Sequence, residues 1–158
     1  MKKIKIASLL FSFFLFFVTI SANTFATDDI KWHKYDEAKK LCNNNQEKLF
    51  IYFYSDSCRY CREMENKTFK DKTVTDILNN NFIPVKINGD NERNLTFTYK
   101  VRGWPGLLFV DDKEEVIFKH LGYIPPEMFK SILKYVYTDS YKTMSIKSYM
   151  ESISSSEK

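Results

Sequence analysis

Apolar residues form runs and alternations that predict four strands. Lys48–Ser55 is almost continuously apolar and aromatic, which is typical of a strand buried on both faces of a sheet. Phe82–Asn88 predicts a second strand. Its Pro84 belongs near a sheet edge or the strand start, because proline has no N–H for a ladder hydrogen bond. Leu107–Val110 and Val116–Leu121 bracket a charged pentapeptide and predict a hairpin.

Elsewhere, apolar residues recur every three or four positions, which is the spacing of one helix face. This spacing predicts helices over Asp36–Asn44, Ser57–Thr68, Asp71–Asn79 and Asn91–Lys100, and a last helix that begins at Pro125. Trp32 shares the spacing of the first helix, so we expect it on the same face as Ala38 and Cys42. Helices and strands in this order predict an α/β sandwich with a central mixed β-sheet flanked by helices.

The first 26 residues have the pattern of a secretory signal peptide. Three lysines precede the apolar stretch Ile6–Ile20, and small residues follow it up to Ala26. We expect cleavage after Ala26, with Ala22 as the second choice. An uncleaved anchor is the alternative, although the apolar stretch is short for a spanning helix of about 20 residues. The short lysine-rich leader is typical of bacteria, so we expect the protein in the periplasm.

We divide the chain into a signal peptide (1–26), one domain (27–140) and a C-terminal tail (141–158). After cleavage, about 130 residues remain, which is enough for one domain with a sizeable core. In the tail, Ser145 is expected to cap a further helical turn, and Ser154–Lys158 is expected to fray. Loss of the leader's lysines lowers the formal charge from +4 to about +1, so the basic composition gives no case for nucleic-acid binding.

A Cys-x-x-Cys motif, Cys58-Arg59-Tyr60-Cys61, stands where the first strand gives way to a helix. Thiols three residues apart at a helix start can form and break one disulfide. Free N–H groups and the helix dipole stabilise a thiolate there, and cysteine pKa values at such positions fall from about 8.5 to roughly 3.5–7.5. The motif therefore predicts redox chemistry.

The motif has two other interpretations, a zinc site and a structural disulfide. Tetrahedral zinc needs two further ligands, and only Cys42, His33 and His120 offer soft ones, without a second closely spaced pair. We therefore expect no metal. A purely structural bridge is the other alternative, but so short a loop gains little stability from closure. Cys42 shares an apolar helix face and is expected to be buried and inert, with a regulatory disulfide as its alternative.

Three segments of the chain, in the same order, resemble landmarks of the thioredoxin fold. Tyr54–Cys61 resembles the active-site segment, Val85–Asp90 the next strand with its acidic exit, and Tyr99–Pro105 followed by Leu107–Val110 the segment with the family's cis-proline. The likeness covers about 31–137. It is closer to exported thioredoxin-like thiol–disulfide proteins, including the periplasmic domain of the membrane thiol reductant transporter. The resemblance implies a thioredoxin-like α/β fold.

The resemblance also implies roles for single residues. Cys58 would be the exposed nucleophile, Cys61 the resolving thiol, and Pro105 a cis-proline against the disulfide. Around them, the substrate groove would be bordered by Pro105, Trp104, Tyr60 and Arg59. The alternatives are an ordinary trans-proline, plain packing for Trp104 and a solvated surface position for Arg59.

Several positions depart from thioredoxin itself. Tyr52 stands where a buried aspartate relays the resolving thiol's proton, and Ser57 replaces a tryptophan before the first cysteine. The bulky Trp104 precedes the expected cis-proline and Gly106 follows it. Lys86 matches a strand lysine near the thioredoxin site, with a solvated edge position as the alternative. These departures favour a specialised exported protein.

We therefore expect a periplasmic thiol–disulfide oxidoreductase that reduces exported cysteine-containing proteins and is recharged by a membrane thiol electron donor. It needs no cofactor, and we expect a monomer because no dimerising segment is evident. The alternatives are a disulfide oxidase or isomerase of the same fold, or a non-catalytic thioredoxin-like binding module.

Overall fold

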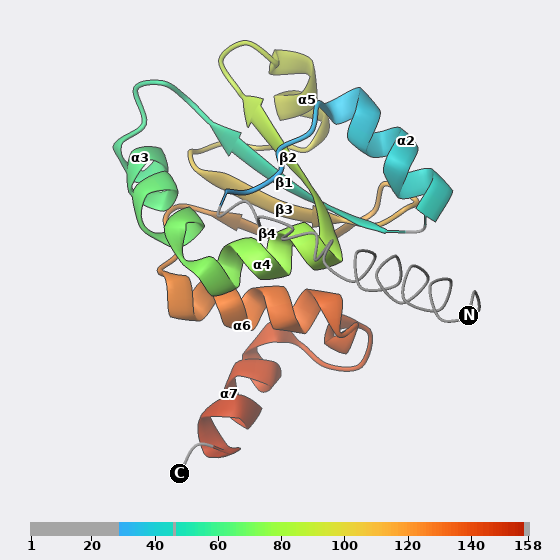
Figure 1. Ribbon diagram of the computed structural model, residues 1–158, viewed down its shortest axis with the longest axis vertical. Helices are drawn as coiled ribbons and strands as arrows, with labels where there is room; N and C mark the ends of the chain where they lie inside the picture. The colour runs from blue at the N-terminus through green and yellow to red at the C-terminus, as the bar shows by residue number, and fades with distance from the viewer. Residues whose placement is uncertain (1–28, 46, 157–158) are drawn as a thin grey trace, which may run out of the picture.

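The computed structural model describes residues 29–45 and 47–156, in which one four-stranded mixed sheet lies between helices (Figure 1). The expected signal peptide lies outside these residues. The strands run β1 (Lys48–Tyr54), β2 (Phe82–Asn88), β3 (Gly106–Val110) and β4 (Val116–Leu121) along the chain, and their order in the sheet is β2-β1-β3-β4. The α/β prediction with a central mixed sheet is confirmed.

Strand β1 occupies an inner position, as its apolar sequence predicts. It pairs in parallel with β2 and antiparallel with β3, and β3 pairs antiparallel with β4 to form the expected hairpin. Strand β2 is the outer neighbour of β1, which agrees with the edge position expected from Pro84. Beyond it, the His33 N–H donates to the Pro84 carbonyl at 2.8 Å.

Helices cover both faces of the sheet. Figure 1 shows α2 and α5 on one side of it and α4 and α6 on the other. Their bounds are α2 Tyr35–Asn45, α3 Arg59–Asn66, α4 Lys72–Asn81, α5 Arg93–Thr98, α6 Pro126–Tyr137 and α7 Ile146–Ser156, with 3-10 turns η1 Thr68–Lys70 and η2 Ser140–Lys142. The cysteine helix was expected to reach Thr68. It ends at Asn66, and the chain tightens into η1 instead.

Side chains that alternate along β1 enter two separate hydrophobic clusters. Phe50 and Tyr52 belong to the cluster that holds the apolar side of α4 and α6, whereas Ile51 and Phe53 belong to the cluster that holds α2. Trp32 was expected beside α2's buried residues, and this is wrong. It precedes α2 and packs in the α4–α6 cluster, 5.9 Å from the Tyr52 ring. Trp32 fits the helical spacing, but it lies before the first residue of α2, so that spacing did not predict its position.

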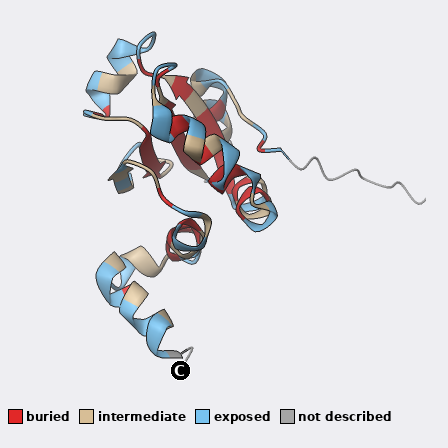
Figure 2. Cartoon of the chain, turned by 90° about the vertical axis from the view of Figure 1, so that its left-hand side faces the viewer, coloured by how far each residue is buried: buried red, intermediate tan, exposed pale blue. Residues whose placement is uncertain are grey.

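The segment after residue 140 is more ordered than a frayed tail. Helix α7 runs for three turns to Ser156, where we expected a single turn and fraying from Ser154. Ser145 caps it as predicted, because its hydroxyl accepts a hydrogen bond from the Ser148 N–H at 3.2 Å. Tyr149 is buried with its ring 5.2 Å from that of Tyr135, while the rest of α7 is mostly exposed (Figure 2). Ile146, Met150 and Ile153 also pack against the cluster that holds α6, so one apolar face ties the helix to α6.

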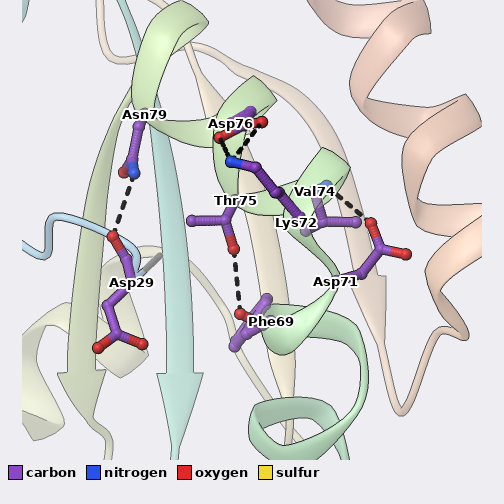
Figure 3. A network of polar contacts seen from close by, with 8 residues as sticks. All are labelled: Asp29, Phe69, Asp71, Lys72, Val74, Thr75, Asp76 and Asn79. Carbon is purple, nitrogen blue, oxygen red and sulfur yellow. Dashed lines mark hydrogen bonds and ion pairs between the residues drawn. The ribbon is translucent and has the colours of Figure 1, made fainter. Parts of the chain in front are cut away.

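Polar side chains hold the start of α4 in place (Figure 3). The carboxylate of Asp71 accepts a hydrogen bond from the Val74 N–H at 3.0 Å, and Thr75 donates to the Phe69 carbonyl at 3.2 Å. Further along the helix, the Asn79 amide donates to the Asp29 carbonyl at 3.1 Å. Lys130 of α6 reaches Asp71 at 3.3 Å, so one carboxylate caps α4 and links it to α6.

Replacing Asp71 by alanine is expected to lower the free energy of unfolding by about 1–2 kcal/mol at pH 7, because it removes the helix cap. Burial raises the pKa of Asp71, but hydrogen bonds from the Val74 N–H and from Lys130 outweigh it and hold the pKa below 3.8. Its contribution is therefore complete above pH 3.8 and is lost as the pH falls through the lowered value. Urea unfolding at pH 7 and below pH 3 measures this. Asp76→Ala, which removes only an exposed ion pair with Lys72, is the control. An equal loss at both pH values would contradict the assignment.

Candidate active site

The two cysteines of the motif lie in a turn between β1 and α3 and are joined by a disulfide. Cys58 is the N-cap of α3, and its sulfur accepts a hydrogen bond from the Cys61 N–H at 3.0 Å. Cys61 is 2% exposed, whereas Cys58 is half-buried. The sulfur of Cys58 is therefore the one that a partner can reach, and it lies where the helix dipole favours a negative charge.

Contacts from three directions fix this turn. Cys58 donates its N–H to the carbonyl of Ser55 at 3.1 Å, and the Arg62 guanidinium donates to the Asp56 carbonyl at 3.2 Å. From the end of β2, the Asn88 amide donates to the Asp56 carboxylate at 3.2 Å. The turn is thus held by its own helix and by the neighbouring strand, so the sulfur of Cys58 has a defined position.

Sheet pairing brings the proline segment to the same end of the sheet. Phe53 of β1 pairs with Gly106 of β3, so Pro105 comes opposite the start of the cysteine turn. The Trp104–Pro105 bond is cis, as the resemblance implied, and Pro105 is buried. A Cβ on Gly106 would meet the Val101 side chain at 2.7 Å, so only glycine fits after the proline. The role of Pro105 against a substrate stays a prediction.

Trp104 packs inside the protein as well as bordering the expected groove. It is half-buried and contacts both hydrophobic clusters. Its indole covers Gly89 at the exit of β2 so closely that a Cβ there would overlap the ring. The packing alternative for Trp104 therefore has direct support, and its position before the cis-proline leaves the groove role open to test.

Gly89→Ala is expected to destabilise the protein by about 1–3 kcal/mol, because the added methyl forces the Trp104 indole out of its place. Urea unfolding gives the loss, and fluorescence in a Trp32→Phe background reports the displaced indole. Gly103→Ala is the matched control, since nothing lies within 4 Å of a Cβ at that position. Trp104→Leu should restore stability to Gly89→Ala. Equal stability of the two alanine variants would show that the indole is free to move.

Tyr60 and Arg59 both point away from the core on the first turn of α3. Tyr60 is 57% exposed and Arg59 is exposed as well. Arg59 makes no ion pair with another described residue. The nearby Glu63 is engaged by Lys67 at 2.6 Å. Both side chains are thus available to a partner beside Cys58, and their part in binding stays a prediction.

Tyr52 forms a polar cluster beneath the buried cysteine. Its hydroxyl lies 3.3 Å from the Cys61 carbonyl and donates to the Glu65 carboxylate at 3.1 Å. Lys86 pairs with the same carboxylate at 3.0 Å, and its ammonium lies 4.6 Å from the centre of the Tyr54 ring. Lys86 is therefore engaged near the site rather than solvated at an edge.

Tyr52 cannot replace an aspartate as a proton acceptor. Burial first, and then the charge and hydrogen bond of Glu65, raise the pKa of Tyr52 far above its ordinary value of 10, so the hydroxyl stays neutral. Among the described contacts of Tyr52, the carboxylate is that of Glu65, which Lys86 also pairs with. Glu65 was not among the site residues expected from the sequence, although its position one helical turn after Cys61 was the available signal.

Cys42 is separate from this site. It is 2% exposed in the cluster on the α2 face, and its thiol donates to the Glu47 carbonyl at 2.8 Å. Burial raises the pKa of the thiol. The prediction of a buried cysteine is confirmed. Within the described ranges 29–45 and 47–156, no group of three or more His, Cys, Asp or Glu side chains is placed to hold a metal ion. Over the same ranges, every helix is too short or too polar to cross a membrane.

Known protein families and sequences share the pattern of this chain. A sequence profile described as a thioredoxin-like domain matches residues 35–137. The thiol:disulfide interchange protein DsbD of Photorhabdus laumondii subsp. laumondii is 29% identical over 89 residues, which cover 54% of this chain and 16% of that protein. A second curated relative is matched over 18% of its length, so the chain spans less than a fifth of these two relatives.

Solved structures show the same fold. A DsbH oxidoreductase superposes with a TM-score of 0.64 at 17% identity, over 70% of this chain and 85% of that one. A thioredoxin from Thermus thermophilus superposes with a TM-score of 0.63 at 26% identity, over 68% of this chain and 87% of that one.

Proposed function

This chain belongs to the thioredoxin-like family, and we propose that it is a thiol–disulfide oxidoreductase that works in the periplasm and reduces disulfides in exported cysteine-containing proteins. A membrane thiol donor would then return its electrons. The observation that carries the proposal is the asymmetry of the Cys58–Cys61 pair. One sulfur is accessible at a helix N-terminus, and the other is buried behind it.

The proposed reaction takes two steps. The Cys58 thiolate attacks one sulfur of a substrate disulfide, forms a mixed disulfide and expels the other substrate sulfur as a thiolate, which takes up a proton. The Cys61 thiol loses its proton and attacks the sulfur of Cys58, which releases the second substrate thiol. The substrate gains two electrons and two protons, and the protein is left with the Cys58–Cys61 disulfide. The two thiols carry both electrons, so the reaction needs no cofactor.

Support for the compartment comes from residues 1–26, which have the signal-peptide pattern. The relative from Photorhabdus laumondii is named a thiol:disulfide interchange protein, which supports the proposed reaction. We propose cleavage after Ala26, an oxidoreductase domain over 27–140 and an appended C-terminal segment over 141–158. The active form is proposed to be a monomer.

The reduction potential of the Cys58–Cys61 pair tests the direction of electron flow. We expect a value near that of thioredoxin, about −270 mV, for a protein that reduces others. Equilibration of the secreted form with defined glutathione ratios, followed by thiol alkylation, measures it. Alkylation of intact cells should find the pair mainly reduced. A potential near about −120 mV, with the pair oxidised in cells, would favour the oxidase alternative.

A double substitution distinguishes the proposed redox function from the alternative of a non-catalytic binding module. Cys58→Ser with Cys61→Ser is expected to abolish reduction of exported partners. Trp104→Ala with both cysteines intact is expected to change which partners are reduced, because the residue borders the cis-proline. A double serine variant that still performs the protein's task in cells would point to binding without redox chemistry.

A further inference from the structure

A basic surface with an exposed aromatic ring lies on α5 and on the segment that follows it. We call the group Arg93, Phe97, Lys100 and Arg102 the α5 basic surface. Phe97 is 85% exposed, the largest fraction among the exposed large hydrophobic side chains of the described residues. All four residues line a hollow of about 580 Å³, together with threonines and Val101. The hollow therefore combines one exposed aromatic ring with three positive charges.

The cations of this surface lack acidic partners. Arg93, Lys100 and Arg102 form no ion pair with any other described residue, and the hollow is lined by no carboxylate. Elsewhere in the described chain many lysines are paired, for example Lys70 with Asp29 and Lys130 with Glu127. Without the leader, the chain is nearly neutral. The positive charge here is therefore a local feature and not the result of a basic protein.

The α5 basic surface directly precedes the cis-proline segment along the chain. Arg102 is two residues before Trp104, which forms the cis bond to Pro105. The Lys119 ammonium donates to the Tyr99 carbonyl at 3.0 Å and to the Lys100 carbonyl at 2.7 Å, which fixes the turn after α5. A substrate segment that extends from Cys58 along the proline segment would therefore run toward this surface.

We propose that the α5 basic surface binds an acidic segment, carrying an apolar or aromatic residue, of the protein whose disulfide Cys58 attacks. The proposal rests on the proposed function, since it assigns a substrate class to the same site. The three cations attract carboxylates and speed the encounter, while the hollow beside Phe97 receives one apolar side chain. A concave surface of this size suits a peptide segment better than the flat face of a membrane.

Two peptide disulfides test the proposal. They share one sequence around the disulfide and one phenylalanine, and differ only in a flanking segment of aspartates or of lysines. With the reduced secreted form of the protein, we expect the acidic peptide to be reduced about 10-fold faster in the second-order regime at low salt. The ratio should fall as salt is added. Phe97→Ser should lower the rates for both peptides, because both carry the same phenylalanine, whereas Arg102→Gln and Lys100→Gln should each lower the ratio toward one. Lys113→Gln, in the exposed β3–β4 turn, is the matched control and should leave it unchanged.

Other outcomes overturn the proposal, and one readout separates it from the proposed function. Equal rates for both peptides, with hydroxyethyl disulfide still reduced by the parent protein, would refute the docking surface alone. Failure to reduce any of the three disulfides would refute the proposed function. Circular dichroism and urea unfolding verify that each variant is folded. Charge-dependent binding to phosphatidylglycerol vesicles without a peptide preference would assign the surface to a membrane and overturn the proposal.

Discussion

Cys58→Ser is expected to reduce the rate of disulfide exchange by roughly 10³-fold or more, to the background of the assay. The variant keeps the buried thiol of Cys61, but that sulfur is 2% exposed and cannot meet a substrate. Reduction of a peptide disulfide by the dithiothreitol-recharged protein measures the loss. Cys42→Ser is the control that should retain activity, because the serine hydroxyl can keep the hydrogen bond to the Glu47 carbonyl.

The same asymmetry predicts the order of alkylation in the reduced parent protein. A limiting dose of iodoacetamide near neutral pH should label Cys58 before Cys61 and Cys42, because Cys58 is the accessible thiol and accepts the Cys61 N–H. Mass mapping of the labelled peptides gives the order. Preferential labelling of Cys61, or full activity of Cys58→Ser, would reverse the two proposed roles.

The second large effect is expected from Cys61→Ser, which should accumulate covalent complexes instead of turning over. Cys58 can still attack a substrate disulfide, but no thiol of the pair remains to break the mixed disulfide. Non-reducing electrophoresis of cells that express the variant should show adducts that disappear with dithiothreitol. Mass spectrometry should find exported cysteine proteins and a membrane thiol protein among them.

Two comparisons make the trapping result decisive. The double variant with Cys58→Ser should show no adducts, because the attacking sulfur is then absent. Cys42→Ser added to Cys61→Ser should leave the adducts unchanged, since Cys42 lies in the cluster on the opposite face of the sheet. Adducts that persist without Cys58, or that vanish without Cys42, would identify Cys42 as the reacting thiol.

The strands and the redox motif could be predicted from local patterns in the sequence. Strands can be recognised in a sequence because successive side chains point to opposite faces of the sheet. Strand β1 is recognisable because both of its faces are apolar. The motif is readable because its two cysteines are three residues apart, so chain geometry alone brings them within reach. The edge position of Pro84 follows from its missing N–H. In each case the physical cause acts within one segment, so the pattern in that segment is sufficient.

Tertiary structure decided the features that join distant segments. Trp32 looked like part of a helix face, and only the fold placed it against Tyr52 on the other side of the sheet. The end of the chain looked polar, yet Tyr149 packs on Tyr135, and Ile146, Met150 and Ile153 pack against the same cluster, so α7 is anchored to α6. These contacts depend on how helices stack on the sheet, and spacing along the chain carries no record of that.

The polar cluster under Cys61 and the α5 basic surface also depend on contacts that only the folded structure shows. Tyr52, Glu65 and Lys86 come from three elements and meet because β1 pairs with β2 beneath α3. The sequence showed their charges but not their partners, so it could not tell a paired lysine from a solvated one. It could not tell that Phe97 stays outside the core either. Burial and pairing are properties of the assembled chain, because they depend on which residues the fold brings to within a few ångströms.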